Sequence, residues 1–148
     1  MFSRDHMYKI IYLFVVLISI PSFAQTICIP NSTGYDVCAN GEYIVSEIAP
    51  SLPMQVDNSM SFESIMAFET TVQFNLQLHF DKKYLVDFYA EHGHKLSDFE
   101  KSLPRSMSIL CKEGNPIRAF IEHGGKVRYL YRFSDGEQFV SFEKTSCE

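Results

Sequence analysis

The sequence predicts an α+β fold: an antiparallel β-sheet with two or three helices packed on one face, stapled by disulfide bonds. Residues 71–80 alternate apolar and polar side chains. This two-residue period is typical of a strand with one buried face and one solvent-exposed face. Residues 81–125 carry apolar side chains at helical spacing, and residues 126–145 have the pattern of a hairpin. This order of strands, helices and strands is typical of an α+β domain whose sheet is covered on one side only.

The first 24 residues have the three-part pattern of a cleavable secretory signal peptide. Arg4 and Lys9 give a basic start, residues 10–20 are apolar, and small side chains precede the expected cleavage site after Ala24. The apolar run is shorter than the roughly 20 residues that span a bilayer, so we expect no stable membrane anchor after cleavage. The first cysteine, Cys28, does not follow the small-residue box of a lipoprotein. We therefore expect a periplasmic or secreted protein without an acyl group.

The remaining residues, 25–148, are long enough for a single α+β domain, which begins with a loop-rich arm over residues 25–41. The full chain has a net charge of −5, and removal of the signal makes the rest more acidic. An acidic chain repels phosphate groups, so we expect neither nucleic acid nor an anionic membrane surface as a partner.

Two strands are expected before the helices, in addition to residues 71–80. Residues 42–48 are predicted to form one of them, and Pro50 and Pro53 interrupt regular structure after it. Residues 61–68 are predicted to form the other, paired with residues 71–80 in a hairpin.

Three helices are predicted in the middle of the chain. Asp81 can cap the first, which ends at the glycine after its last turn. The second covers residues 95–111, where Pro104 should kink or split it. The third begins at Asn115-Pro116, because proline is tolerated at the first helical position. The side chains expected to face inward are Tyr84, Leu85 and Phe88, then Leu96, Phe99, Leu103, Met107 and Leu110, and finally Ile117, Phe120 and Ile121.

The chain closes with a hairpin around an Asp135-Gly136 turn, whose second strand is predicted over residues 139–145. Its first strand carries Arg128 and Arg132 on one face, with Lys126 beside them. These three are candidate partner-binding residues for an acidic partner, and the alternative is a solvated strand face. The edge strands of either hairpin could also pair with a strand of a partner.

All four cysteines, Cys28, Cys38, Cys111 and Cys147, follow the signal. An even number of cysteines in an exported chain favours disulfides over metal binding or catalysis. Three connectivities are possible and the sequence does not choose among them, although proximity favours Cys28–Cys38 and so leaves Cys111–Cys147. A zinc site is disfavoured because the closely spaced cysteine pairs of structural zinc sites are missing.

No motif for catalysis, a cofactor or a metal stands out. His92 and His94, with Glu91 nearby, could bind a metal, but two histidines flanking a glycine turn are not a standard ligand set. At a helix end they can pair instead with free carbonyl groups. No serine lies in a nucleophile elbow, and cysteines in disulfides cannot act as nucleophiles. We therefore expect a protein that is not an enzyme and holds no cofactor.

One set of features is Cys111 followed by Asn115-Pro116-Ile117-Arg118, an apolar helix ending at Gly125, the strand 127–131, the Asp135-Gly136 turn and the terminal Cys147. In these features the chain resembles small exported bacterial α/β proteins with disulfides, which include pilotins of certain type II secretion systems. The resemblance implies a Cys111–Cys147 bond, helices packed against a sheet, and an adaptor that binds another envelope protein in a groove between helix and sheet. Working pilotins are lipoproteins, whereas this chain lacks the acylation cysteine and adds a Cys28–Cys38 arm.

Three functions agree with these features. A periplasmic binding or adaptor protein for secretion or envelope assembly would have an apolar groove or an open strand edge. An inhibitor or immunity-type protein that blocks an enzyme would use a rigid exposed loop, for which the Cys28–Cys38 arm is the candidate. A periplasmic metal-dependent enzyme would bring His92, His94 and a carboxylate into one pocket.

Overall fold

The computed structural model describes residue 28 and residues 32–147. The predicted signal over residues 1–24, its cleavage site and part of the loop-rich arm lie outside the described residues, so these remain predictions. Within the described part of the chain, no helix is both long and apolar enough to cross a membrane.

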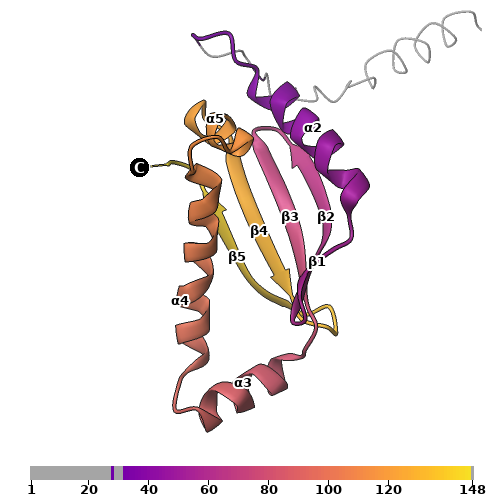
Figure 1. The fold of residues 1–148 in the computed structure, drawn as a ribbon, viewed down its shortest axis with the longest axis vertical. Coiled ribbons are helices and arrows are strands. Elements are labelled where there is room, and N and C mark those ends of the chain that lie inside the picture. The colour runs from indigo at the N-terminus through magenta and orange to yellow at the C-terminus, as the bar shows by residue number, and fades with distance from the viewer. Residues whose placement is uncertain (1–27, 29–31, 148) are drawn as a thin grey trace, which may run out of the picture.

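A five-stranded sheet with the strand order β1-β2-β3-β4-β5 forms one layer (Figure 1). Three of its four strand pairs are antiparallel, and the central pair, β3 with β4, is parallel. The strands are β1 (Met54–Asp57), β2 (Met60–Phe68), β3 (Thr71–Leu78), β4 (Lys126–Arg132) and β5 (Gln138–Lys144).

The parallel pair departs from the antiparallel sheet that the sequence predicts. Antiparallel neighbours can be joined by a tight turn, whereas parallel strands need a long crossover. Here the crossover carries three helices and returns the chain to the start of β3, where Thr71 lies opposite Lys126. The amide of Lys126 also donates a hydrogen bond of 2.8 Å to the carbonyl of Thr70. The fold is therefore α+β, as predicted, with a mostly antiparallel sheet.

The helices lie over one face of the sheet and beyond its lower end (Figure 1). Helix α2 crosses β2 and β3, α4 runs beside β5, and α3 lies past the end of the strands. The helices are α2 (Val37–Ile48), α3 (Lys82–Glu91), α4 (Leu96–Ser106) and α5 (Pro116–Glu122), with 3-10 turns η1 (Ala49–Ser51) and η2 (Met107–Cys111).

Helix α2 corrects the prediction of a strand over residues 42–48. The side chain of Asp36 accepts a hydrogen bond of 3.0 Å from the amide of Ala39 and so caps the helix. From there, apolar residues at helical spacing, including Val37, Ile44 and Ile48, turn toward the core. A short apolar run fits both helix and strand, and here packing against β2 and β3 selects the helix. The loop-rich arm is correspondingly shorter than predicted.

The three predicted helices are confirmed, with their caps. Asp81 accepts a hydrogen bond of 2.7 Å from the amide of Tyr84, and Asn115 accepts one of 2.9 Å from the amide of Ile117. Pro104 lies inside α4, and the chain tightens into η2 three residues later at Met107, so the predicted helical stretch is split.

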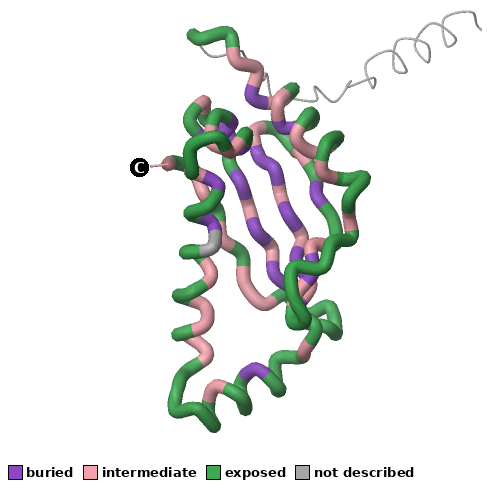
Figure 2. The backbone as a smooth tube through the Cα atoms, in the orientation of Figure 1, coloured by how far each residue is buried: buried purple, intermediate pink, exposed green. Residues whose placement is uncertain are grey.

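The core fills the space between the sheet and its helical cover, as Figure 2 shows by the buried positions along β3 and β4. Its largest fully buried side chains are those of Tyr131, Phe120 and Phe133. On the opposite face of β3, Gln73, Asn75 and Gln77 are only half-buried. The predicted alternation of a dry and a wet face is therefore confirmed.

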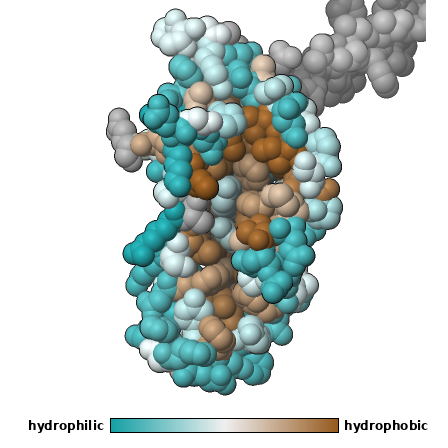
Figure 3. Space-filling model, in the orientation of Figure 1, coloured by the Kyte–Doolittle hydropathy of each residue, from teal (hydrophilic) through white to brown (hydrophobic). Residues whose placement is uncertain are grey.

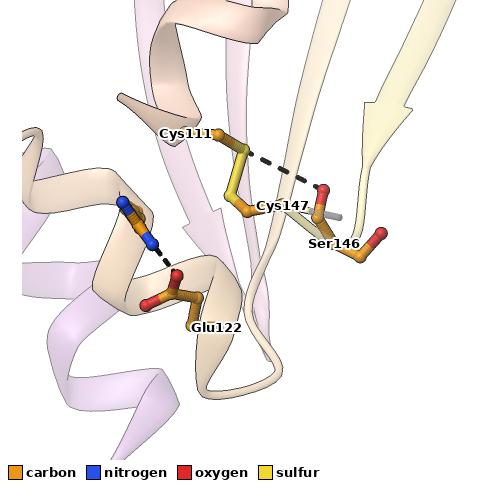
Figure 4. A network of polar contacts seen from close by, with 5 residues as sticks. Cys111, Glu122, Ser146 and Cys147 are labelled. Atoms are coloured by element: carbon orange, nitrogen blue, oxygen red, sulfur yellow. Dashed lines mark hydrogen bonds and ion pairs between the residues drawn. A yellow bond between two sulfur atoms is a disulfide. The ribbon is translucent and has the colours of Figure 1, made fainter. Parts of the chain in front are cut away.

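Two cysteine pairs lie at disulfide distance, in the connectivity that proximity favours. Cys28 is paired with Cys38 in the first turn of α2. The Cys111–Cys147 bond, with an S–S distance of 2.06 Å, joins the end of η2 to the chain after β5, next to Glu122 of α5 (Figure 4). This second pair ties the helical layer to the last strand.

Candidate protein-binding site

An apolar groove opens between α3, α4 and the end of the sheet, with a volume of about 350 Å³. Its size falls within the usual range for binding pockets. The floor comes from β2 and β3, and the walls come from the two helices. The groove is lined by Asp57, Ser59, Met60, Leu78, Phe80, Tyr84, Leu85, Phe88, Tyr89, Phe99 and Leu103.

Aromatic contacts hold the two walls in place. Phe99 of α4 stacks on Phe139 of β5, with ring centroids 5.8 Å apart, and Tyr89 of α3 packs against Phe99 at 5.7 Å. Leu85 is the one residue of α3 that is fully buried. Leu85 and Tyr89 are the residues of α3 that are not exposed, so the rest of this helix does not pack on the core.

The outer part of α3 departs from the sequence prediction. Tyr84 and Phe88 were expected to face inward with Leu85, but they are 57% and 44% exposed. Their rings stack with centroids 6.2 Å apart, and Phe80 continues the row at 5.6 Å from Tyr84. The physical reason is that the strands end before α3, so no sheet lies beneath this part of the helix. Exposed Tyr84 and Phe88, with half-buried Phe80 beside them, therefore form the mouth of the groove.

A second apolar hollow, the α2 hollow, lies between the end of α2 and the sheet, with a volume of about 370 Å³. Figure 3 shows apolar side chains gathered along the middle of this face, between hydrophilic rims. The hollow is lined by Glu47, Ile48, Ser51, Leu52, Met54, Phe62, Phe74, Ile117 and Tyr129. Strand β1 links the two, because Met54 lines the α2 hollow and Asp57 lines the groove.

The three candidate basic residues lie elsewhere, on the sheet face opposite the helices. Arg128 forms an ion pair of 2.8 Å with Glu143, and its guanidinium lies 5.5 Å from the ring centroid of Phe68. Arg132 donates a hydrogen bond of 3.3 Å to the carbonyl of Gly136. Lys126 is exposed at the start of β4. These residues therefore do not take part in the groove, and their role in partner binding remains a prediction.

The histidines considered as metal ligands sit at the end of α3. His92 donates from Nδ1 to the carbonyl of Phe88 at 2.7 Å, and its ring lies 4.4 Å from the ring of Phe88. The ring of His94 lies 6.4 Å from that of Tyr89. Over the described ranges, no three His, Cys, Asp or Glu side chains come close enough together to hold a metal ion.

A serine, a histidine and a glutamate meet where β2 begins and β3 ends, which the sequence did not indicate. The Oγ of Ser61 lies 3.0 Å from Nε2 of His79 and also hydrogen-bonds to the carboxylate of Glu63. The serine has one proton, and an ionised carboxylate can only accept, so the Ser61 hydroxyl donates to Glu63. The Nδ1 of His79 also faces the carbonyl of Asn58 at 3.2 Å, and because a carbonyl can only accept, this nitrogen donates. The contacts together form a hydrogen-bond network across the two strands.

With this geometry established, the chain can be compared with known proteins. No family model and no curated protein matches it. Among solved structures it is similar to the type II secretion pilotin EpsS from Vibrio vulnificus, with a TM-score of 0.57 and 16% identity over 76% of this chain and 92% of that one. It is also similar to the pilotin AspS from Vibrio cholerae, with a TM-score of 0.54 and 17% identity over 74% and 88%.

The chain shares its fold with these pilotins. A third similar structure is that of PA3611 from Pseudomonas aeruginosa, with a TM-score of 0.58 and 9% identity over 76% of this chain and 93% of that one. The resemblance inferred from the last third of the sequence is thereby confirmed as a likeness of fold that covers about three quarters of the chain.

Some of the residues that line the groove could be predicted from the sequence. The apolar stripes of two consecutive helices contain Leu85, Phe99 and Leu103, which line it. Its floor, formed by Met60, Leu78 and other strand residues, was not predicted as part of a site, nor was the α2 hollow. The alternation in β3 indicates which face of the strand is apolar. The sequence does not show which end of that face the helices leave uncovered.

Proposed function

We propose that this protein is a non-enzymatic periplasmic adaptor that binds an apolar segment of another envelope protein in the groove between α3, α4 and the sheet. The observation that carries the proposal is the row of Phe80, Tyr84 and Phe88 at the mouth of an apolar groove, in which Tyr84 and Phe88 are exposed and Phe80 is half-buried. Scattered exposed apolar residues are ordinary, but a contiguous patch of them is typical of an interaction site.

Two further features support a role in secretion or envelope assembly. The fold is that of two type II secretion pilotins. The predicted export signal and the two cysteine pairs suit an oxidising compartment such as the periplasm. The context of Cys28 suits a form without a lipid anchor, so the adaptor would reach its partner by diffusion.

Site-specific photo-crosslinking in the periplasm of the source cell tests the proposal. A photoreactive phenylalanine analogue replaces Tyr84 at the groove, and in a control it replaces Tyr43, which is 61% exposed on α2 and lines neither hollow. We expect one adduct with an envelope protein from position 84, absent from position 43. The adduct should disappear in a Leu103→Asp variant that is still secreted and folded, because a charge on the groove wall opposes an apolar ligand.

The identity of the adduct decides between functions. Mass spectrometry should identify a protein of the secretion or envelope-assembly machinery. An adduct with a hydrolase would support the inhibitor or immunity-type function instead. The same yield of adducts from positions 84 and 43, or none from position 84, would contradict binding in the groove.

A further inference from the structure

The aspartate and glutamate side chains that line the hollows of this face have no lysine or arginine among their fellow lining residues. Asp57 is the charged residue that lines the groove, and Glu47 is the one that lines the α2 hollow. A third hollow adjoins the groove, shares Phe80 and Tyr84 with it, and adds Asp81 and His79. No lysine or arginine is among the described residues that line these three hollows.

Asp57 interacts electrostatically with His79, and Asp81 with Lys83, but these carboxylates otherwise rely on hydrogen bonds. Asp57 accepts hydrogen bonds from the amide and hydroxyl of Ser59, and these bonds lower the pKa of its carboxyl group. Asp81 accepts from the amide of Tyr84. None of Glu47, Asp57 and Asp81 forms an ion pair with a described lysine or arginine.

Elsewhere on the described surface, some basic residues are matched by acidic ones. Lys82 pairs with Glu137 at 2.8 Å, and Arg118 pairs with Glu122 at 2.6 Å. Lys83, which is close enough to Asp81 to interact electrostatically, forms its ion pair with Asp87. Carboxylates without a lysine or arginine partner therefore line the apolar surface, although others, such as Glu113, lie elsewhere on the described part of the chain.

We infer that the segment bound in the groove is basic as well as apolar, with lysine or arginine side chains that meet Asp57 in the groove, Asp81 in the hollow beside it and Glu47 in the α2 hollow. The inference rests on the proposed function, because it names the chemistry of the partner at the same site. Apolar burial supplies most of the affinity in such a complex, whereas complementary charge supplies specificity and faster association. Acidic or neutral apolar segments would bind more weakly.

Two labelled peptides of equal length test the inference, with identical apolar residues and either lysine or glutamate at the remaining positions. Fluorescence anisotropy measures their binding to the exported protein with both disulfides formed. We expect the lysine peptide to bind about tenfold more tightly at low salt, as three exposed ion pairs would provide. Salt screens such pairs, so the preference should shrink as ionic strength rises.

Matched variants separate local charge from overall acidity. Glu47→Gln/Asp57→Asn/Asp81→Asn removes three charges at the site, and asparagine keeps the oxygen that accepts each aspartate's hydrogen bonds. The control, Glu113→Gln/Asp36→Asn/Asp135→Asn, removes the same number from one glutamate, the aspartate that caps α2 and an aspartate in the turn before β5. The site variant should bind both peptides equally, and the control should keep the preference.

The possible results distinguish the inference from the proposed function. If both peptides bind equally to the unmodified protein and Leu103→Asp weakens both, the groove binds apolar segments but the inferred charge preference is wrong. A preference that survives in the site variant would also overturn the inference. If neither peptide binds, the groove is not a site for apolar segments and both statements fail.

Discussion

Phe99 of α4 and Phe139 of β5 stack with their ring planes only 12° apart and their centroids 5.8 Å apart. Phe133 packs against Phe139, with ring centroids 4.9 Å apart, and is itself fully buried. The stack is the aromatic contact that joins α4 to the sheet, so it fixes one wall of the groove. Its loss should affect both the stability of the protein and the shape of the candidate site.

Phe99→Ala should therefore lower the free energy of unfolding by about 1–3 kcal/mol, less than for a fully buried phenylalanine because Phe99 is only half-buried. Phe88→Ala removes the same atoms from an exposed position and should cost less than about 1 kcal/mol. Urea unfolding of both variants measures the difference. Equal losses would mean that α4 is not held to the sheet by this stack.

The two disulfides should differ in their contribution to stability. The Cys111–Cys147 bond spans 36 positions and the Cys28–Cys38 bond spans 10. In the chain-entropy model, their removal costs about 4 and about 3 kcal/mol respectively, because the longer loop loses more freedom when it is closed. Alanine pairs at each site, compared by urea unfolding, check the order. A larger loss at Cys28–Cys38 would contradict it.

Elements with local signals could be predicted from the sequence. Helices α3 and α5 each begin at a residue whose side chain caps the helix, Asp81 and Asn115, and both caps are visible within four residues. The hairpin of β4 and β5 follows from Asp135-Gly136 and the alternation on either side. These features depend on neighbouring residues alone, so the rest of the fold is not needed to recognise them.

Features that depend on distant contacts could not be predicted. Residues 42–48 are helical because α2 packs on β2 and β3, and a short apolar segment does not contain that information. The parallel pairing of Val72 with Val127 depends on the path of the long crossover. The exposure of Tyr84 and Phe88 depends on where the sheet ends. The mouth of the candidate site is therefore the part that the sequence showed least clearly.

Two glycines should respond oppositely to alanine. A Cβ atom on Gly125 would lie 2.5 Å from the ring of Phe120, which is fully buried and has no free space to move into. Gly125→Ala should therefore lower the free energy of unfolding by about 1–3 kcal/mol. A Cβ atom on Gly41 would meet Phe120 and Val72 at an ordinary 3.5 Å.

Gly41→Ala should accordingly leave stability unchanged or raise it by up to about 1 kcal/mol, because alanine favours the interior of a helix such as α2. Thermal or urea unfolding of the two variants provides the comparison. If Gly41→Ala is as harmful as Gly125→Ala, α2 lies closer to the sheet than the structure shows.

The free energy of unfolding should fall at alkaline pH because the buried phenol of Tyr129 loses its proton. Burial, with a further contribution from Tyr131, raises the pKa of Tyr129 to about 12. The unfolded chain would release this proton near pH 10, where tyrosine ordinarily titrates. The folded state therefore binds the proton more tightly, and its advantage is complete below about pH 10 and is lost as the pH rises to about 12.

The free energy of unfolding should fall over that window by at most about 3 kcal/mol on account of Tyr129. Tyr129→Phe has no proton to lose, so its alkaline loss should be smaller by the same amount. Tyr35, whose pKa is also raised by burial, contributes with the same sign in both proteins and cancels in the comparison. Urea unfolding at several alkaline pH values gives the two slopes. Parallel slopes would show that the phenol of Tyr129 is accessible to water in the folded protein.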